Sequence, residues 1–298
     1  MKTGADPRVI RIFGLWWVSL ALNASAVDVA IAPAGNGVVI TWPAGGTNEF
    51  YVQASSSLSK PDAWRITTNT IFLDGTNYFI MDGTIADSRF YRLQAWEILF
   101  DGTSVSAFRG YQQTSFPSSS YWVVTNGELQ TVPGTGGNPP SIITTNLYSD
   151  FELWWEWKVP SGGNSGVNYR CTEEYPNPEW SGPEFQLTYD ADLLTPAKRR
   201  IGAVWDLIAP TNRVVVPAGQ WNQCRLLVQS NYVEHWLNSN RVVAYYLNSA
   251  PFTNIVATNS TFSQYPNFAN ARTGYIAFRE EGSVTSFRNI KIRRLPPQ

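Results

Sequence analysis

The stretch PEFQLTYD, residues 183–190, alternates polar and apolar side chains from Glu184 onward. In an extended strand, successive side chains point to opposite faces of the sheet. The apolar face carries Phe185, Leu187 and Tyr189, and the polar face carries Glu184, Gln186, Thr188 and Asp190. This period is typical of a strand with one face in a core, so the stretch predicts a sheet that packs against a second sheet. Its polar face is expected on the outside.

The same period of two recurs along most of the chain after Val27, interrupted at short intervals by Gly, Pro, Asn and Ser. Residues 150–160 (DFELWWEWKVP) have large side chains on both faces, as expected of a strand in the centre of a sandwich. We find no convincing helical periodicity longer than about two turns. The pattern predicts an all-β protein in which residues 96–298 form a jelly-roll sandwich of two curved sheets. Its strands are expected at residues 150–160, 166–171, 184–190, 223–229, 232–238, 273–278 and 286–292.

Residues 27–95 are expected to form a separate, smaller β-sandwich, with strands that include residues 38–42, 50–54 and 88–93. An early strand with a Trp, a later strand with a Tyr and about 70 residues suggest a small immunoglobulin-like sandwich. The block loosely resembles the fibronectin type III-like modules attached to secreted bacterial enzymes. This resemblance implies a spacer or docking module rather than chemistry.

The first 26 residues have the composition of an export signal. Three basic residues precede a short apolar stretch at residues 15–22 (LWWVSLAL), and residues 24–26 (ASA) supply the small side chains that a signal peptidase needs. We predict cleavage after Ala26 and a mature chain that is secreted, periplasmic or on the cell surface. The alternatives are a retained membrane anchor or a wrongly chosen start codon. No apolar run of about 20 residues occurs, so a transmembrane helix is not expected.

The composition argues against several classes of function. The 298 residues carry a net charge of −1, which leaves no surplus of Lys and Arg to neutralise nucleic-acid phosphates. Cys171 and Cys224 are expected either as two buried thiols or as one disulfide. Two separated cysteines and a single histidine argue against a zinc site, and no cofactor is evident. A structural calcium ion, held by loop carbonyls and Asp side chains, is compatible with the sequence, although no EF-hand-like motif is present.

Polar side chains on two predicted strands favour a carbohydrate cleft. Asn168 and Arg170 are polar residues of one strand, as Glu184 and Gln186 are of the other. Strict alternation puts Val167, Tyr169 and Cys171 on the core face. Six tryptophans lie on nearby segments: Trp154, Trp157, Trp180, Trp205, Trp221 and Trp236. Sugars offer apolar ring faces to aromatics and hydroxyls to carboxylates, amides and guanidinium groups, so a curved sugar-binding face is expected. The alternative is an ordinary solvated sheet face.

Several segments together resemble the family of 3-keto-disaccharide hydrolases, formerly a domain of unknown function. The matching runs are residues 150–158 (DFELWWEWK), 161–170 (SGGNSGVNYR), 182–186 (GPEFQ) with Asp190, 206–210 (DLIAP), 233–238 (VEHWLN) and 286–292 (SFRNIKI). They extend over residues 99–295, and their order makes the resemblance specific. It implies a concanavalin A-like jelly roll, a secreted or periplasmic location and activity on oxidised sugars.

The implied reaction cleaves a 3-keto-glycoside or 3-keto-disaccharide by base-assisted elimination and hydration. The ketone acidifies the neighbouring C–H bond, so a base can remove that proton and the anomeric substituent can leave before water adds. Such a route needs a base, a group that stabilises the enolate and a proton donor for the leaving group. We assign Glu184 as the base. The expected substrate ligands are Gln186 for a hydroxyl, Arg170 for the oxyanion, and Asn168 and Trp205.

Five further candidates have roles that the sequence leaves open. Asp190 is a second carboxylate on the Glu184 face, but six residues of extended strand span about 20 Å, too far for a close pair. Asp206 would hold a sugar hydroxyl or cap a turn. His235 is an acid–base candidate, although its apolar strand neighbours favour a structural histidine in the core. Asn164 would shape a turn or reach the ligand.

The fifth open candidate is Glu281, which stands where the sequence departs from the family pattern. Where the family often carries Asp-His-Gly, this chain has Glu-Glu-Gly at residues 280–282. Either Glu281 replaces that histidine, or the activity is lost or altered. The rival functions are therefore a carbohydrate-binding, lectin-like module without turnover and a surface adhesion protein. The carboxylate-bearing strand face favours the enzyme.

Overall fold

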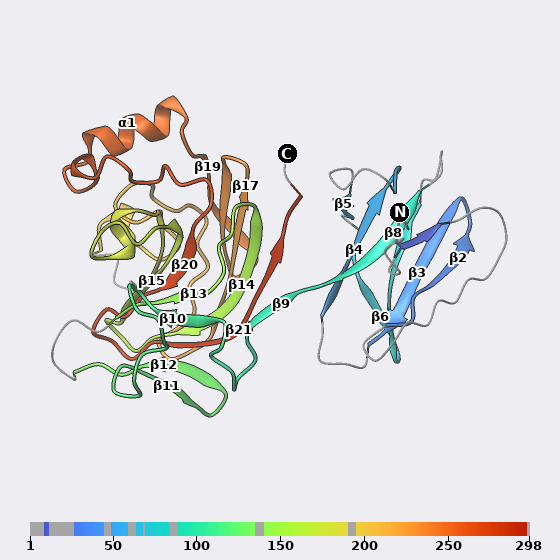
Figure 1. The fold of residues 1–298 in the computed structure, drawn as a ribbon, viewed down its shortest axis with the longest axis horizontal. Helices are drawn as coiled ribbons and strands as arrows, with labels where there is room; N and C mark the ends of the chain where they lie inside the picture. Colours follow the sequence, from blue (N-terminus) through green and yellow to red (C-terminus); the bar gives the residue numbers. More distant parts are fainter. Residues whose placement is uncertain are drawn as a thin grey trace. The chain divides into compact units, whose positions relative to one another are not determined.

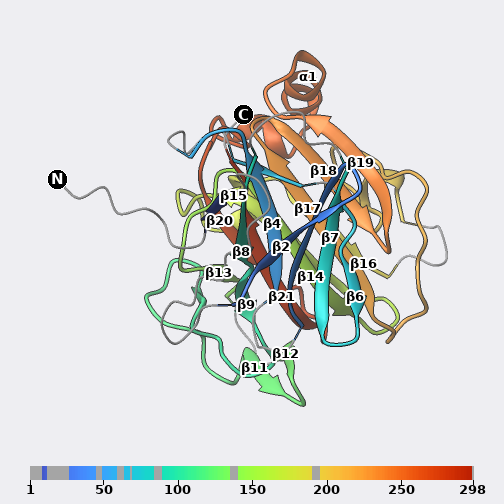
Figure 2. The same cartoon turned by 90° about the vertical axis from the view of Figure 1, so that its right-hand side faces the viewer.

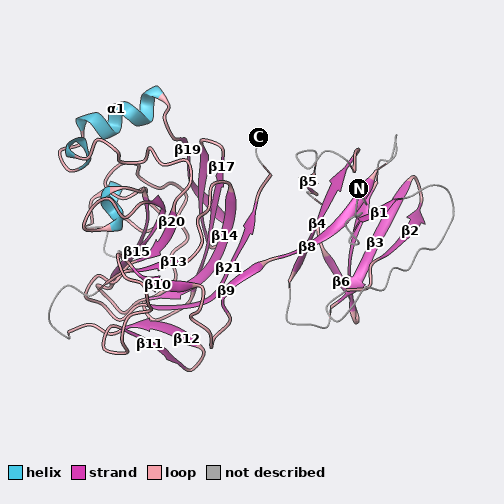
Figure 3. Cartoon of the chain, in the orientation of Figure 1, coloured by secondary structure: helices cyan, strands magenta, loops and turns pink. Residues whose placement is uncertain are grey.

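Short strands joined by turns make up nearly all the regular structure of the chain (Figures 1 and 3). The computed structural model describes residues 9–11, 27–44, 49–58, 64–67, 69–83, 89–134, 140–189 and 195–296. The chain divides into two compact units, residues 1–96 and 97–298.

Two antiparallel sheets form the second unit. One sheet has the strand order β10 (Phe108–Gly110), β13 (Ile142–Thr144), β20 (Tyr275–Phe278), β15 (Asn164–Cys171) and β16 (Glu184–Thr188). The other has the order β11 (Trp122–Thr125), β12 (Glu128–Thr131), β21 (Ser286–Arg294), β14 (Phe151–Lys158), β17 (Asn222–Gln229), β18 (Tyr232–Leu237) and β19 (Asn240–Tyr246). β9 (Glu97–Phe100) also pairs with β21, which makes this sheet eight-stranded. Figure 2 shows β17, β18 and β19 side by side at one end of it.

The apolar faces of the two sheets enclose one core. Phe185 and Leu187 lie in this core, as their alternation predicts, together with Trp155 and Trp157 of β14. Trp155 and Phe185 meet edge to face at 5.2 Å between ring centroids, which joins β14 of the larger sheet to the edge strand β16 of the smaller one. Burying a large apolar side chain contributes roughly 1.5–3 kcal/mol, so these aromatics are a main source of stability. The predicted jelly-roll sandwich is confirmed.

The described residues of the first unit form two four-stranded sheets. One has the order β1 (Val9–Arg11), β8 (Phe90–Ala95), β4 (Phe50–Ser55) and β5 (Arg65–Ile66), and the other β2 (Ala30–Ala34), β3 (Gly37–Pro43), β7 (Asn77–Asp82) and β6 (Phe72–Asp74). Trp42 and Tyr91 are buried in its core, and the Tyr91 hydroxyl donates to Asp82 at 2.9 Å. The fibronectin type III-like assignment stays a prediction.

The predicted export signal lies mostly outside the described residues, which exclude 1–8 and 12–26. Residues 9–11 form β1, which pairs antiparallel with β8, so a chain cleaved after Ala26 would lack this strand. The signal itself stays a prediction. In the described part of the chain, none of the helices has the length and hydropathy needed to cross a membrane.

One helix was missed by the sequence analysis. α1 (Ala250–Thr258) follows β19 and is mostly exposed, with Phe252 buried. Ser249 caps its N-terminus by accepting a hydrogen bond from the Phe252 amide, and a proline lies in the first turn. A Ser followed by Pro at this spacing is a helix-start signal. The helix is too short for its periodicity to be recognised.

A β-bulge in β15 breaks the predicted alternation of that strand. The register with β20 shifts between Asn168 and Cys171, and Arg170 has a φ of 51°. Tyr169 therefore lies in the main core, whereas Cys171 packs with Tyr111 on the opposite face. The placement of Cys171 on the core face was wrong because one extra residue in the bulge reverses the alternation. Both cysteines are buried free thiols, which excludes the disulfide alternative.

Candidate functional site

Polar side chains of three adjacent strands meet on the outer face of the five-stranded sheet. Glu184 of β16 pairs directly with Asn168 of β15, and Gln186 pairs with Gly166. The alternation correctly placed these side chains away from the core. They are nevertheless closed off from solvent: Asn168 is 0% exposed and Glu184 and Gln186 are each 4% exposed. The alternative of an ordinary solvated sheet face is therefore wrong at this position.

The cover over this face is the segment between β15 and β16, residues 172–182, here called the capping segment. It contains the 3-10 helix η2 (Pro178–Trp180), which contributes the buried Glu179. Ser181 closes the segment at its base, because its hydroxyl accepts from the Thr172 amide at 2.9 Å and donates to the Thr172 carbonyl. Alternation within strands cannot reveal a loop that folds back over them.

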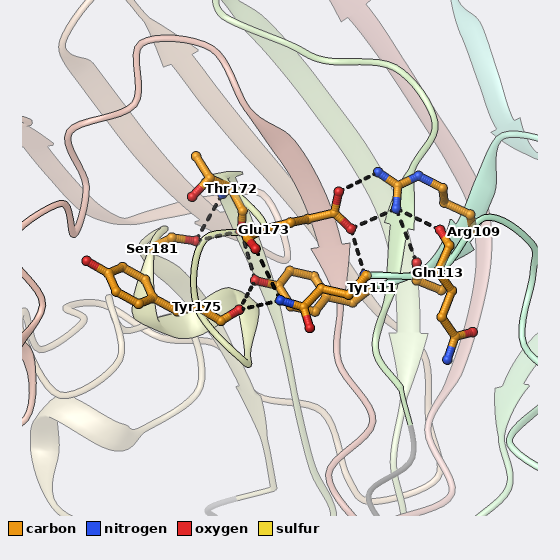
Figure 4. Close-up of polar contacts among 9 residues, drawn as sticks. Arg109, Tyr111, Gln113, Thr172, Glu173, Tyr175 and Ser181 are labelled. Carbon is orange, nitrogen blue, oxygen red and sulfur yellow. Dashed lines mark hydrogen bonds and ion pairs between the residues drawn. The ribbon is translucent and has the colours of Figure 1, made fainter.

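A clamp on β10 fixes the other part of the capping segment (Figure 4). Arg109 donates through both terminal nitrogens to the Glu173 carboxylate, at 2.7 and 2.8 Å. The Tyr111 hydroxyl reaches the Thr172 and Tyr175 carbonyls at 2.9 and 2.7 Å. A bidentate guanidinium–carboxylate pair is geometrically specific, so the clamp sets the position of the segment that carries Glu179.

Beneath the capping segment, three carboxylates converge on one guanidinium group. Arg279, which follows β20, donates through Nη1 to Glu184 Oε2 at 2.7 Å and through Nη2 to Glu179 Oε1 at 2.8 Å. It also forms an ion pair with Glu281. We call Glu179, Glu184, Glu281 and Arg279 the Arg279 cluster. The side chains of Arg279 and Glu281 are 14% and 21% exposed, so solvent reaches the cluster from this side.

Gly166 makes room for the Glu184 carboxylate. A Cβ atom at this position would lie 2.2 Å from Glu184 Oε1, so any larger residue would displace the carboxylate. Next to it, the Gln186 amide donates to Asn164 Oδ1 at 3.1 Å in one orientation and to Glu184 Oε1 at 2.9 Å when its nitrogen and oxygen are exchanged. Asn164 in turn donates to Glu281 Oε2 at 3.3 Å. Four of the residues assigned from the sequence, Asn164, Gln186, Glu184 and Glu281, thus occupy one site.

Burial and neighbouring charges shift the proton affinity of this site. Loss of solvation, reinforced by the negative charges of Glu281 and Glu179, raises the pKa of Glu184 to about 7, although Arg279 opposes the shift. Burial likewise raises the pKa of Glu179, against the attraction of Arg279. Near neutral pH, Glu184 therefore exists in both protonation states, which is what a general acid–base group requires.

Two buried acceptor atoms beside the cluster have no hydrogen-bond partner among the described residues. They are Glu179 Oε2 and Asn168 Oδ1. The other end of the Asn168 amide donates to the Gly182 carbonyl at 3.1 Å, so its orientation is fixed. Buried acceptors of this kind are costly unless something donates to them.

Arg170 does not take part in this site, and its assignment as the oxyanion stabiliser was wrong. Its guanidinium group donates to the Ser149 carbonyl at 2.6 and 2.9 Å and to the Ser230 carbonyl at 2.8 Å, and it contacts Asp150 at 3.2 Å. The bulge in β15 turns this side chain away from the Glu184 face. Arg170 is therefore a buried link between the two sheets, and Arg279 is the guanidinium group beside Glu184.

His235 lies in the core, 0% exposed, as the structural alternative predicted. Its Nε2 is 3.0 Å from the Tyr169 hydroxyl and its Nδ1 is 3.0 Å from the Gly202 carbonyl. Burial lowers its pKa to about 4, so the imidazole is neutral. The Gly202 amide donates to the Gln186 carbonyl at 2.9 Å, and the Gln186 amide donates to the Ala203 carbonyl at 3.1 Å, so this segment pairs with the outer edge of β16. His235 thus supports the strand of Glu184 from behind and does not touch the Arg279 cluster.

Trp205 and Asp206 lie beside β16 without pointing to a role in chemistry. The Trp205 amide donates to the Glu184 carbonyl at 3.1 Å, and its half-buried ring meets Phe262 at 5.8 Å. Asp206 has a φ of 56° and accepts from Arg199 at 2.7 Å, which matches the turn-ordering alternative. Asp190 lies outside the described residues.

The tryptophans do not form one surface. Trp157 is part of the core, and Trp180, at the end of η2, stacks on Tyr265 at 4.9 Å between ring centroids. Trp154 and Trp236 flank Arg225 on the outer face of the eight-stranded sheet. They were grouped wrongly because sequence proximity does not say which outer face a strand residue occupies.

Arg279 and Glu179 were not found from the sequence. Arg279 could have been found by extending the alternation of β20, because Tyr275 and Ala277 precede it on the same outer face. Glu179 lies in the capping segment, where no periodicity operates, and carried no comparable signal.

Comparison with known proteins places this all-β sandwich in the class of carbohydrate-active enzymes. Residues 95–293 match the 3-keto-alpha-glucoside-1,2-lyase-like domain, and the chain belongs to this family. It is 28% identical over 228 residues to a 3-keto-disaccharide hydrolase of Bacteroides thetaiotaomicron, covering 66% of this chain and 77% of that one.

Solved structures show the same relationship. Two glycosyl hydrolase candidates from Parabacteroides distasonis are each 25% identical to this chain. The match to the first has a TM-score of 0.61 and covers 67% of this chain and 94% of the matched chain. The match to the second has a TM-score of 0.53 and covers 68% of this chain and 100% of the matched chain.

Proposed function

We propose that this protein cleaves 3-keto-glycosides by elimination and hydration, with Glu184 as the base. The observation that carries the proposal is the contact between Glu184, whose pKa is raised to about 7, and the guanidinium group of Arg279. A base in this range is ionised in part at neutral pH and still takes up a proton readily. The membership of the chain in the family supports the 3-keto sugar as substrate.

In the first step, Glu184 removes the proton from the carbon between the ketone and the anomeric centre. The electron pair of the broken C–H bond forms an enolate, whose negative oxygen Arg279 stabilises. The enolate then expels the anomeric oxygen substituent, which takes up a proton as it leaves. Glu281, ion-paired with Arg279 at the solvent-exposed side of the cluster, is proposed to orient a water molecule that delivers that proton.

In the second step, water adds across the resulting C=C bond. The oxygen of the water that gave its proton to the leaving group bonds to the anomeric carbon, and the neighbouring carbon regains a proton from Glu184, which now acts as an acid. The sum of the two steps is hydrolysis: one water is consumed, Glu184 returns to its ionised form and Glu281 keeps its charge throughout. Asn164 and Gln186, which contact the two carboxylates, are proposed to hold sugar hydroxyls.

The second proposal concerns location. The basic and apolar character of residues 1–26 supports export, and the first unit would act as a spacer or docking module for a secreted enzyme. Mass measurement of the mature protein tests the cleavage, which we expect after Ala26.

The reaction is tested by incubating the protein with a 3-keto-glucoside and with the matching unoxidised glucoside, and by following release of the aglycone. We expect only the 3-keto compound to be consumed, because an unactivated C–H bond is too weak an acid for Glu184. Equal turnover of both compounds would contradict the elimination route. Binding of either compound without turnover would support the lectin-like alternative.

A further inference from the structure

Charge in the Arg279 cluster is unbalanced. Three carboxylates, those of Glu179, Glu184 and Glu281, share the one guanidinium group of Arg279. With all four groups ionised, the cluster carries a formal charge of −2, and three of its side chains are at most 14% exposed. Water therefore screens this charge poorly.

The buried hydrogen-bonding groups at the site that lack a partner are also mostly acceptors. Both terminal nitrogens of Arg279 already donate to carboxylates, which leaves its Nε as the unpartnered donor of this group among the described residues. The unpartnered acceptors outnumber it: Glu179 Oε2 and Asn168 Oδ1 are both buried and lack a partner in the described part of the chain. A ligand that satisfies these atoms must bring hydroxyl or ammonium groups, because carboxylate and phosphate oxygens cannot donate when ionised.

We infer that this site selects its sugar by charge, accepting neutral and amino sugars and rejecting uronates and sugar phosphates. The inference rests on the proposed function only in that the ligand is a sugar. A negative group that enters the cluster must lose water and meet a surplus of negative charge, and both effects oppose binding. An ammonium group would meet the same surplus as an attraction and would also donate to the free acceptors.

Direct binding tests the inference independently of turnover. Calorimetric titration of the full chain at pH 7.5 would use glucose, 2-amino-2-deoxyglucose, glucuronate and glucose 6-phosphate as probes. We expect the amino sugar to bind at least about tenfold more tightly than glucuronate, a modest ratio for a unit charge in a poorly solvated site. Equal or tighter binding of glucuronate or of the sugar phosphate would overturn the inference, as would the absence of binding by all four sugars.

Two variants link the ratio to the cluster. Glu179→Gln keeps the side-chain shape and removes one negative charge, so the preference for the amino sugar should fall severalfold. Glu281→Gln serves the same purpose if the first variant does not fold. The matched control is Glu156→Gln on the outer face of the eight-stranded sheet, where Glu156 pairs with Arg288. An unchanged ratio in both cluster variants, or an equal fall in the control, would overturn the inference.

The same titrations separate the two proposals. Selective sugar binding together with failure to consume any 3-keto-glycoside would refute the proposed reaction and leave charge selection standing. Turnover of a 3-keto-glycoside with a reversed order of sugar affinities would refute charge selection and leave the reaction standing.

Discussion

Two buried glutamates on the outer faces of the two sheets have opposite electrostatic surroundings. Glu152 of β14 accepts from Trp154 at 3.0 Å and forms ion pairs with Arg225 and Arg293. Glu184 of β16 shares one arginine with two other carboxylates. Both glutamate side chains are only 3% exposed, so the difference lies in their partners and not in their depth.

The two environments shift proton affinity in opposite directions. Burial raises the pKa of Glu152, but Arg293 and Arg225 outweigh this and the net pKa is below its ordinary value. Burial also raises the pKa of Glu184, and there the single Arg279 does not compensate. A carboxylate surrounded by arginines stays ionised at neutral pH and has a structural role. A carboxylate with too few cations nearby can exchange a proton at neutral pH, which makes it a candidate acid–base group.

Removing the only cation of the cluster should have the largest effect. For Arg279→Met we expect a loss of about 3–5 kcal/mol in the free energy of unfolding at pH 8, because three carboxylates are left without their counter-ion. The loss should shrink at pH 5.5, where the raised pKa values of Glu179 and Glu184 favour their neutral forms. Denaturant unfolding at both pH values measures this.

The control for that measurement is Arg288→Met on the other sheet. Its pair with Glu156 is substantially exposed, so its removal should cost no more than about 1 kcal/mol. An equal loss in both variants, or no pH dependence for Arg279→Met, would show that the cluster is not short of positive charge.

Replacing the proposed base should abolish most of the activity. For Glu184→Gln we expect turnover of a 3-keto-glycoside to fall by about a hundredfold or more, the usual contribution of a general base. Glu152→Gln should leave the rate constant within about twofold, since Glu152 lies on the other sheet. Near-normal turnover by Glu184→Gln would exclude Glu184 as the base.

The same substitution should flatten the pH dependence of stability. Because the pKa of Glu184 is raised in the folded state, the native protein binds the proton more tightly than the unfolded chain does. Its contribution to stability is therefore present at acidic pH and is lost as the pH rises from about 4.5 to about 7. In Glu184→Gln, unfolding measured across this window should lose that decline. An unchanged pH profile would show that folding does not raise the pKa of Glu184.

Glu152→Gln sharpens the comparison from the other side. It leaves Arg225 and Arg293 without their shared carboxylate, and we expect a loss of about 2 kcal/mol at pH 7, moderated because both arginines reach solvent. Here the folded pKa is lowered, so the stabilisation by Glu152 is present at neutral pH and is lost in acid. Thermal unfolding at pH 7 and pH 4 should show the variant approaching the parent protein at the lower pH.

The smallest expected effect is a shift in the pH–rate profile. Activity should rise with pH as Glu184 loses its proton, with a midpoint near pH 7. In Glu281→Gln, the loss of a neighbouring negative charge should move this midpoint to lower pH, by less than about one unit. A midpoint that moves upward, or not at all, would mean that Glu281 does not act on Glu184 through its charge.

Much of the fold and part of the site could be predicted from the sequence, and the exceptions share a cause. Alternation correctly predicted that Phe185 and Leu187 enter the core and that Glu184 and Gln186 point away from it. It could not predict the bulge at Arg170, because the sequence continues to alternate through the position where the register shifts.

The capping segment over the site could not be predicted from the alternation of the sequence either. The capping segment has no periodicity, and the clamp between Arg109 and Glu173 joins residues 64 positions apart. The sequence therefore predicted which strand and face bear Glu184 and missed the loop that removes solvent from it. That desolvation, with the missing counter-charge, is what raises the pKa of Glu184.

The passage from β8 to β9 has a practical consequence for separating the two units. β8 ends at Ala95 and β9 begins at Glu97, so Trp96 alone joins two paired strands. Proteases cut where several consecutive residues can unfold into an extended, exposed loop, and this junction offers none. Limited digestion should therefore nick loops inside the units before it parts them, and a clean second unit must be made by starting translation at Glu97.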